Sequence, residues 1–164
     1  MKKIKLIIAT MIFIILDASV TKNIQLFNAV PMLTYAFVIC VALLEEDFMI
    51  SVVLSGVCGI LQGSLIGNHF ELTFIFYSFT AIILNYFKSR RITGVLRGVL
   101  FCASMTVILN LVNLVIDAEM INLHMMYNLI FAVIYNVIAV SAIYALTKRI
   151  IYSKNRQSRI INNI

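Results

Sequence analysis

Long apolar runs separated by short polar segments dominate the hydrophobic pattern of this chain. A helix that crosses the hydrocarbon core of a bilayer, about 30 Å thick, needs roughly 20 residues at 1.5 Å each. Runs near this length lie at residues 4–21, 26–44, 48–66, 71–87, 94–116 and 124–147. The pattern therefore predicts an all-α polytopic membrane protein with six transmembrane helices. We expect one transmembrane domain at 1–150 and a short basic tail at 151–164.

Composition supports this prediction because the chain carries few charges. Of its 164 residues, 12% are charged and 62% are hydrophobic, whereas a soluble domain keeps about a quarter of its residues charged. The predicted helices use most of the chain, which leaves too little for a soluble domain. Function is therefore expected in the helices, the short loops and the tail.

The basic residues predict which side of the membrane each loop faces. With the N-terminus in the cytoplasm, Lys22 alone of the 13 Lys and Arg residues lies outside. Cytoplasmic loops carry the excess of Lys and Arg, so both termini are predicted to be cytoplasmic. The net charge of +6 is then an orientation signal. Nucleic acid is not an expected partner, since its binding needs a soluble basic face.

The first apolar run also has features of a signal peptide, with the basic start "MKKIK" and the apolar stretch "LIIATMIFIIL". We favour a retained helix because the following "DAS" is a poor cleavage site. Removal of this run would also place the basic loop and tail on the wrong side of the membrane.

No residue pattern in the sequence is typical of catalysis. His69 and His124 are the two histidines, both in predicted outside loops, and neither belongs to an HExxH motif. A metal site would need further ligands that converge with them, such as Glu71, Asp117 or Glu119. We expect solvated loop residues instead, and so no catalytic residue, cofactor or metal. The three cysteines form no CxxC pair and are expected to be small packing residues.

The third apolar run carries small residues at a regular spacing of four. The positions are Ser55, Gly59, Gly63 and Gly67. Glycine costs roughly 1 kcal/mol against alanine in a helix in water, but small residues let membrane helices approach closely. We expect this face to pack against another helix of the same chain, with a partner helix or a second copy of the chain as the alternatives.

Amide, hydroxyl and carboxyl groups recur along the last three predicted helices. Polar groups that face lipid are costly, so these should face the interior of the bundle. Two interpretations stay open: hydrogen bonds between helices, or a polar cavity between the fourth, fifth and sixth helices that opens outside near Asp117. The residues are Asn85, Thr106, Asn110, Asn113, Asp117, Asn128 and Asn136. In the first helix, Asp17 is expected to mark the membrane interface.

The second and third spans carry a resemblance to a known family. Pro31 opens the second span as "PMLTYAF", a short turn follows, and the third helix carries Gly59 and Gly67. Together with six spans and a basic tail, these features resemble the rod shape-determining protein MreD family. The resemblance covers essentially the whole chain.

The resemblance implies a non-enzymatic subunit of the bacterial cell-elongation machinery in the cytoplasmic (inner) membrane. Such subunits scaffold or regulate peptidoglycan synthesis and cell shape with an MreC-like membrane protein, MreB, RodA and a penicillin-binding protein. The implied fold is similar to that of the S components of energy-coupling factor transporters. A substrate-binding S component for a vitamin or metal is therefore the alternative, although the small-residue docking face of those proteins is missing where Phe13 follows Ala9.

Basic residues in the predicted cytoplasmic segments are candidate contact points. They are Lys88, Arg90, Arg91, Lys148 and Arg149. Such residues attract anionic membrane lipid, and docking of a protein partner is the alternative interpretation.

Overall fold

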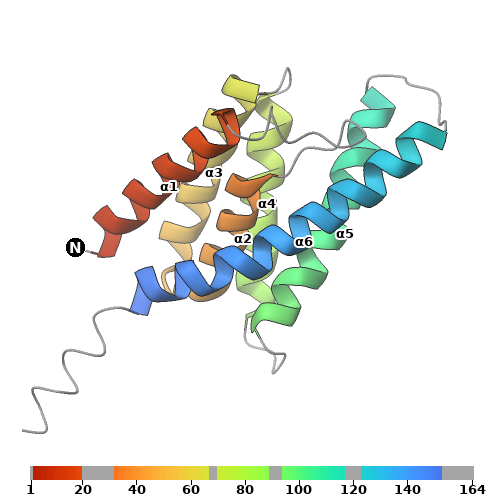
Figure 1. Ribbon diagram of the computed structural model, residues 1–164. Helices are drawn as coiled ribbons and strands as arrows, with labels where there is room; N and C mark the ends of the chain where they lie inside the picture. Colours follow the sequence, from red (N-terminus) through yellow and green to blue (C-terminus); the bar gives the residue numbers. More distant parts are fainter. Residues whose placement is uncertain (1, 20–31, 67–69, 89–93, 117–122, 153–164) are drawn as a thin grey trace, which may run out of the picture.

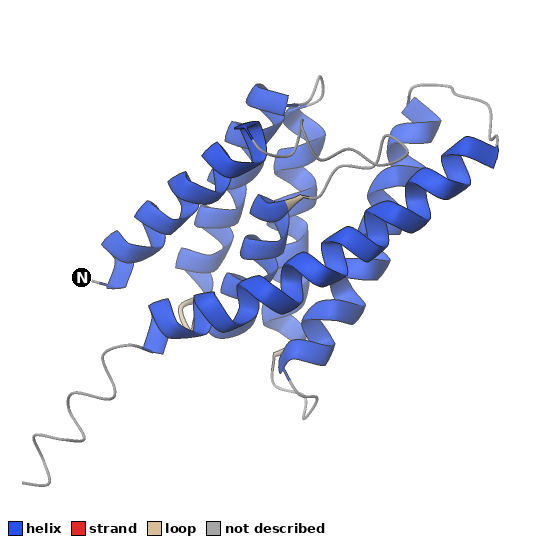
Figure 2. Cartoon of the chain, viewed as in Figure 1, coloured by secondary structure: helices blue, strands red, loops and turns tan. Residues whose placement is uncertain are grey.

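The computed structural model describes residues 2–19, 32–66, 70–88, 94–116 and 123–152 (Figure 1). Over these residues the protein is all-helical, as the sequence predicts (Figure 2). The helices are α1 (Lys2–Ser19), α2 (Leu33–Leu44), α3 (Phe48–Ile66), α4 (Phe70–Phe87), α5 (Gly94–Ile116) and α6 (Leu123–Tyr152).

The second helix is the one whose length departs most from the predicted runs. We predicted 26–44, whereas α2 has 12 residues and begins at Leu33. Pro31 and residues 20–30 lie outside the described residues. A helix of this length rises only about 18 Å, less than the bilayer core of about 30 Å. By contrast, α3 and α5 have the predicted bounds, and α6 continues to Tyr152.

The short helix α2 lies at the centre of the bundle. It contacts each of the other five helices, and all its residues from Thr34 to Leu44 are buried. A helix that is covered on every side needs no polar face, which explains why its sequence, "LTYAFVICVALL", is apolar almost throughout. On two sides its aromatic rings pack against rings of neighbouring helices. Phe37 stacks on Phe13 of α1 at 4.7 Å, and Tyr35 lies tilted against Tyr77 of α4 at 4.9 Å between ring centroids.

Side chains from α1 and α6 hold the start of α2. The buried carboxylate of Asp17 accepts the backbone N–H of Leu33 at 2.8 Å and that of Thr34 at 2.7 Å. Asn136 Oδ1 accepts the N–H of Met32 at 2.9 Å. The first N–H groups of a helix have no partner within the helix, and a negative charge there is favourable. Two distant segments therefore fix where α2 begins.

Within the described residues, three helices are long and apolar enough to cross a membrane. The segments are Phe48–Leu65, Phe70–Phe87 and Met126–Tyr152. Leu33–Leu44 and Gly98–Val112 are shorter apolar helices. The length and composition of these helices indicate a membrane protein.

Several helix ends meet at one end of the bundle. Lys88, after α4, donates to the backbone oxygen of Glu45, after α2. The hydroxyl of Tyr152, at the end of α6, donates to the backbone oxygen of Leu44 at 3.4 Å. The N-terminus of α1 lies on the same side (Figure 1). We call this the basic end, because it holds Lys3, Lys5, Lys88, Lys148 and Arg149.

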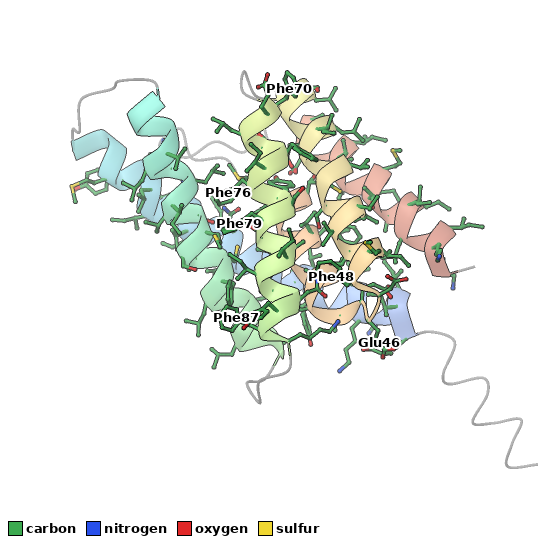
Figure 3. All side chains as sticks on the ribbon, turned by 180° about the vertical axis from the view of Figure 1, so that it is seen from behind. Glu46, Phe48, Phe70, Phe76, Phe79 and Phe87 are labelled. Carbon is green, nitrogen blue, oxygen red and sulfur yellow. The ribbon has the colours of Figure 1, made fainter. Side chains whose placement is uncertain are left out.

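Figure 3 shows the two ends of the bundle from behind. Glu46 and Phe48 lie near the end of α4 that holds Phe87, whereas Phe70 lies at the opposite end. The turn between α2 and α3 therefore belongs to the basic end.

Candidate functional site: the glycine face and the buried polar network

The glycines of α3 lie against α4 of the same chain. A Cβ at Gly59 would lie 2.7 Å from the backbone oxygen of Thr73 and 2.8 Å from Cα of Phe74. A Cβ at Gly63 would lie 2.5 Å from Cα of Phe70. Real Cβ atoms do not approach backbone so closely, so only glycine allows this separation of the helices. The α3–α4 interface is also the most extensive between any two helices of the described chain.

Other members of the predicted small-residue face are placed differently. Ser55 is buried, and its hydroxyl donates to the backbone oxygen of Ser51 on its own helix at 2.7 Å. Gly67 and Pro31 lie outside the described residues. The prediction missed Gly56, where a Cβ would lie 2.9 Å from Cε2 of Phe74. The face that meets α4 therefore includes Gly56, Gly59 and Gly63.

A hydrogen bond between Thr106 and Asn136 joins α5 to α6, and Asn136 also connects both helices to the start of α2. Asn136 Nδ2 donates to Thr106 Oγ1 at 3.1 Å, and both side chains are buried. The Thr106 hydroxyl donates in turn to the backbone oxygen of Cys102 at 2.7 Å. Because the other atom of the Asn136 amide accepts the N–H of Met32, one side chain links three helices.

The structure divides the remaining polar candidates between two places. Asn85 does not join the network of Asn136, because its Nδ2 donates to Ser51 of α3 at 3.1 Å. Asn110 Nδ2 donates to the backbone oxygen of Thr106 at 2.8 Å, and Asn128 is half-buried on α6. Asn113 belongs to α5, but its side chain and all of Asp117 lie outside the described residues.

A buried pair between α3 and α4 was not predicted. The hydroxyl of Tyr77 donates to Gln62 Oε1 at 2.6 Å, and both residues are buried. Beside them, the hydroxyls of Tyr35 and Thr80 lie 3.2 Å apart. The available signal was that Gln62 and Tyr77 belong to consecutive apolar runs and lie at a similar distance from the loop that joins them.

The basic candidates lie at the surface of the basic end. Lys148 and Arg149 are exposed in the last turns of α6, whereas Lys88 is half-buried and bonded to the backbone of Glu45. Arg90 and Arg91 lie outside the described residues.

The described residues form neither a metal-binding cluster nor a pair of bonded cysteines. No group of three or more His, Cys, Asp or Glu side chains could hold a metal ion there. Cys40, Cys58 and Cys102 are buried free thiols. His69 lies outside the described residues, as does the side chain of His124.

Comparison of the chain with protein-family models, with curated proteins and with solved structures gives no match. The functional argument therefore starts from the residues and their arrangement.

Proposed function

We propose that the chain is a non-enzymatic membrane subunit of the bacterial cell-elongation machinery, of the kind that the MreD family provides. The observation that supports this proposal is the contact of α3 with α4. Gly59, one of the residues that carry the resemblance, lies where only glycine allows the two backbones to approach. The repeated glycines are thus explained by close helix packing, the role small residues have in membrane bundles.

As part of the same proposal, all six helices cross the cytoplasmic membrane and both termini are cytoplasmic. The gathering of Lys3, Lys5, Lys88, Lys148 and Arg149 at the basic end supports this orientation, because Lys and Arg are in excess on the cytoplasmic side. The residues of α2 from Thr34 to Leu44 are buried and do not face lipid, so this helix does not need the full length of the bilayer core.

The proposed role is scaffolding rather than solute capture. Asn136 and Thr106 would be central to a polar cavity, yet each is bonded to the other and to backbone. This favours interhelical hydrogen bonding over a binding site at these two side chains. Since α4 occupies the glycine face, the surface that we propose for an MreC-like partner or for MreB, RodA or a penicillin-binding protein is the basic end.

Purification of the tagged protein from its native membranes in mild detergent, followed by mass spectrometry, tests the proposal. We expect enrichment of MreC-like, MreB-like and wall-synthesis proteins. The double variant Lys148→Gln/Arg149→Gln should recover less of them at equal amounts of membrane protein. The matched control is Ser141→Ala/Leu146→Ala, because both side chains are exposed on α6 and neither is charged.

The transporter alternative predicts a different set of proteins. Recovery of ABC-type ATPases with a transmembrane coupling protein, and of no wall-synthesis protein, would overturn the proposal. Depletion of the chain gives a second readout: rod-shaped cells should become round if it serves in elongation, and should keep their shape if it captures a solute.

A further inference from the structure

An apolar groove opens on the surface of the helix bundle between α1 and α3. It has a volume of about 490 Å³. Its walls include Ile7 and Met11 of α1 and Ile50, Val53 and Val57 of α3. The two helices run in the same direction away from the basic end (Figure 1), and the groove begins near that end, at Lys3 and Met49.

One charged side chain lines the groove among the described residues. Lys3 stands at the basic end, on the first turn of α1, and its side chain is exposed. Thr10 also lines the groove, but its hydroxyl donates to the backbone oxygen of Leu6 at 2.8 Å. The groove therefore offers a ligand one cation at its entrance and hydrocarbon along its length.

The length of the groove distinguishes between the occupants that a membrane could supply. The lining residues run from Lys3 to Met11 on α1 and from Met49 to Val57 on α3. At 1.5 Å per residue this is about 12 Å, under half of the bilayer core of about 30 Å. This depth suits an acyl chain of one leaflet, whereas a partner helix that crosses the membrane would extend well beyond the groove.

The acidic residues near the entrance do not line the groove. The carboxylate of Asp47 accepts the N–H of Met49 at 3.0 Å and that of Ile50 at 3.3 Å, and so caps the start of α3. Neither Asp47 nor Glu46 lines the groove.

We propose that this groove binds an anionic phospholipid of the cytoplasmic leaflet, with its phosphate beside Lys3 and one acyl chain between α1 and α3. This proposal rests on the membrane orientation that forms part of the proposed function, but not on a role in wall synthesis. Its failure and that of the proposed function are therefore distinguishable.

The absence of tryptophan from the sequence allows a direct test in vesicles. Val53→Trp places a single fluorophore in the groove, since Val53 lines it and is 63% exposed. Ile82→Trp is the control, because Ile82 is exposed on α4 away from the groove and lies five residues from the basic end of its helix, as Val53 does. Each variant is reconstituted with brominated phosphatidylglycerol or brominated phosphatidylcholine at equal mole fraction.

We expect phosphatidylglycerol to quench the groove tryptophan preferentially, with an affinity about fivefold above that of phosphatidylcholine for one lysine near the surface. The preference should fall to that of Ile82→Trp when Lys3→Gln is added. It should persist with Lys5→Gln, which removes the same charge from the same turn of α1 but does not line the groove. Met11→Trp repeats the measurement from the α1 wall in case Val53→Trp does not fold.

Two results would overturn the proposal. Equal quenching by the two lipids at both reporters would mean that the groove does not select a headgroup. Strong quenching of Ile82→Trp with little quenching of either groove reporter would mean that protein, rather than lipid, covers the groove.

Discussion

Asp17 shows how much a single side chain contributes to this fold. Its carboxylate accepts two backbone N–H groups at the start of the buried helix α2. Asp17→Ala leaves both groups without this acceptor, which should lower the free energy of unfolding by about 1–3 kcal/mol. Asp17→Asn keeps one acceptor oxygen and should lose less. Both are measured as shifts in the unfolding midpoint when sodium dodecyl sulfate is added to the protein in mild detergent.

Ser19→Ala is the matched control for this substitution. Ser19 lies at the end of the same helix, is exposed, and donates its hydroxyl to the backbone oxygen of Ile15. Its replacement should leave the midpoint unchanged. A midpoint for Asp17→Ala equal to that of the parent protein would show that the carboxylate does not hold α2.

The pair of Tyr77 and Gln62 gives a second prediction at the residue scale. Tyr77→Phe removes a buried donor that lies 2.6 Å from Gln62 Oε1. In a double-mutant cycle with Gln62→Leu, we expect a coupling free energy of about 0.6–1.7 kcal/mol, between the average and the maximum for hydrogen bonds between membrane helices. Tyr86→Phe serves as the control because Tyr86 is 78% exposed. Additive effects of the two substitutions would contradict the contact.

At the scale of the helix, the α3–α4 interface depends on which atoms a new side chain would meet. A methyl group at Gly59 or Gly63 would meet backbone of α4, which cannot move alone, whereas at Gly56 it would meet the ring of Phe74. We therefore expect Gly59→Ala and Gly63→Ala to lower the detergent unfolding midpoint more than Gly56→Ala. Inserted amounts in the membrane should stay equal, because insertion depends on the hydropathy of the segment.

The larger substitutions Gly59→Leu and Gly63→Leu should weaken the assembly of the bundle further. Ile60→Leu is the control on the same helix, since Ile60 is 42% exposed and does not belong to the glycine face. If both leucine variants were as stable as this control, close packing would not be the reason for the glycines.

Helix α2 shows which part of the element pattern could be predicted from sequence and which could not. Hydropathy gave the existence of all six helices and the bounds of α3 and α5, because long apolar runs have few alternatives. It did not give the start of α2 at Leu33. That start depends on Asp17 and Asn136, which come from distant segments. The hydropathy of residues near Leu33 does not indicate such contacts.

The same limit applies to the arrangement of the whole molecule. Polar residues were correctly expected to be buried at Thr106 and Asn136, because lipid excludes them. The sequence could not show whether Asn85 joins Thr106 and Asn136. The spacing of residues along a helix shows which of them share a face, but not which other helix that face contacts. The structure places Asn85 against α3 and Asn136 against α2 and α5.

The orientation of the whole molecule gives the last prediction. Glu46 lies near the basic end and Glu71 belongs to the first turn of α4, at the opposite end that Phe70 marks (Figure 3). Both glutamates are exposed, and the native cysteines are buried, so a single new cysteine at either position can be labelled selectively. With a membrane-impermeant maleimide on intact cells whose outer layers admit it, Glu71→Cys should react and Glu46→Cys should react only after the membrane is permeabilised.

The parent protein, with its three buried thiols, measures the background. The reverse pattern would place the basic end outside, against the excess of Lys and Arg in cytoplasmic loops, and labelling of both positions in intact cells would contradict a membrane-spanning bundle.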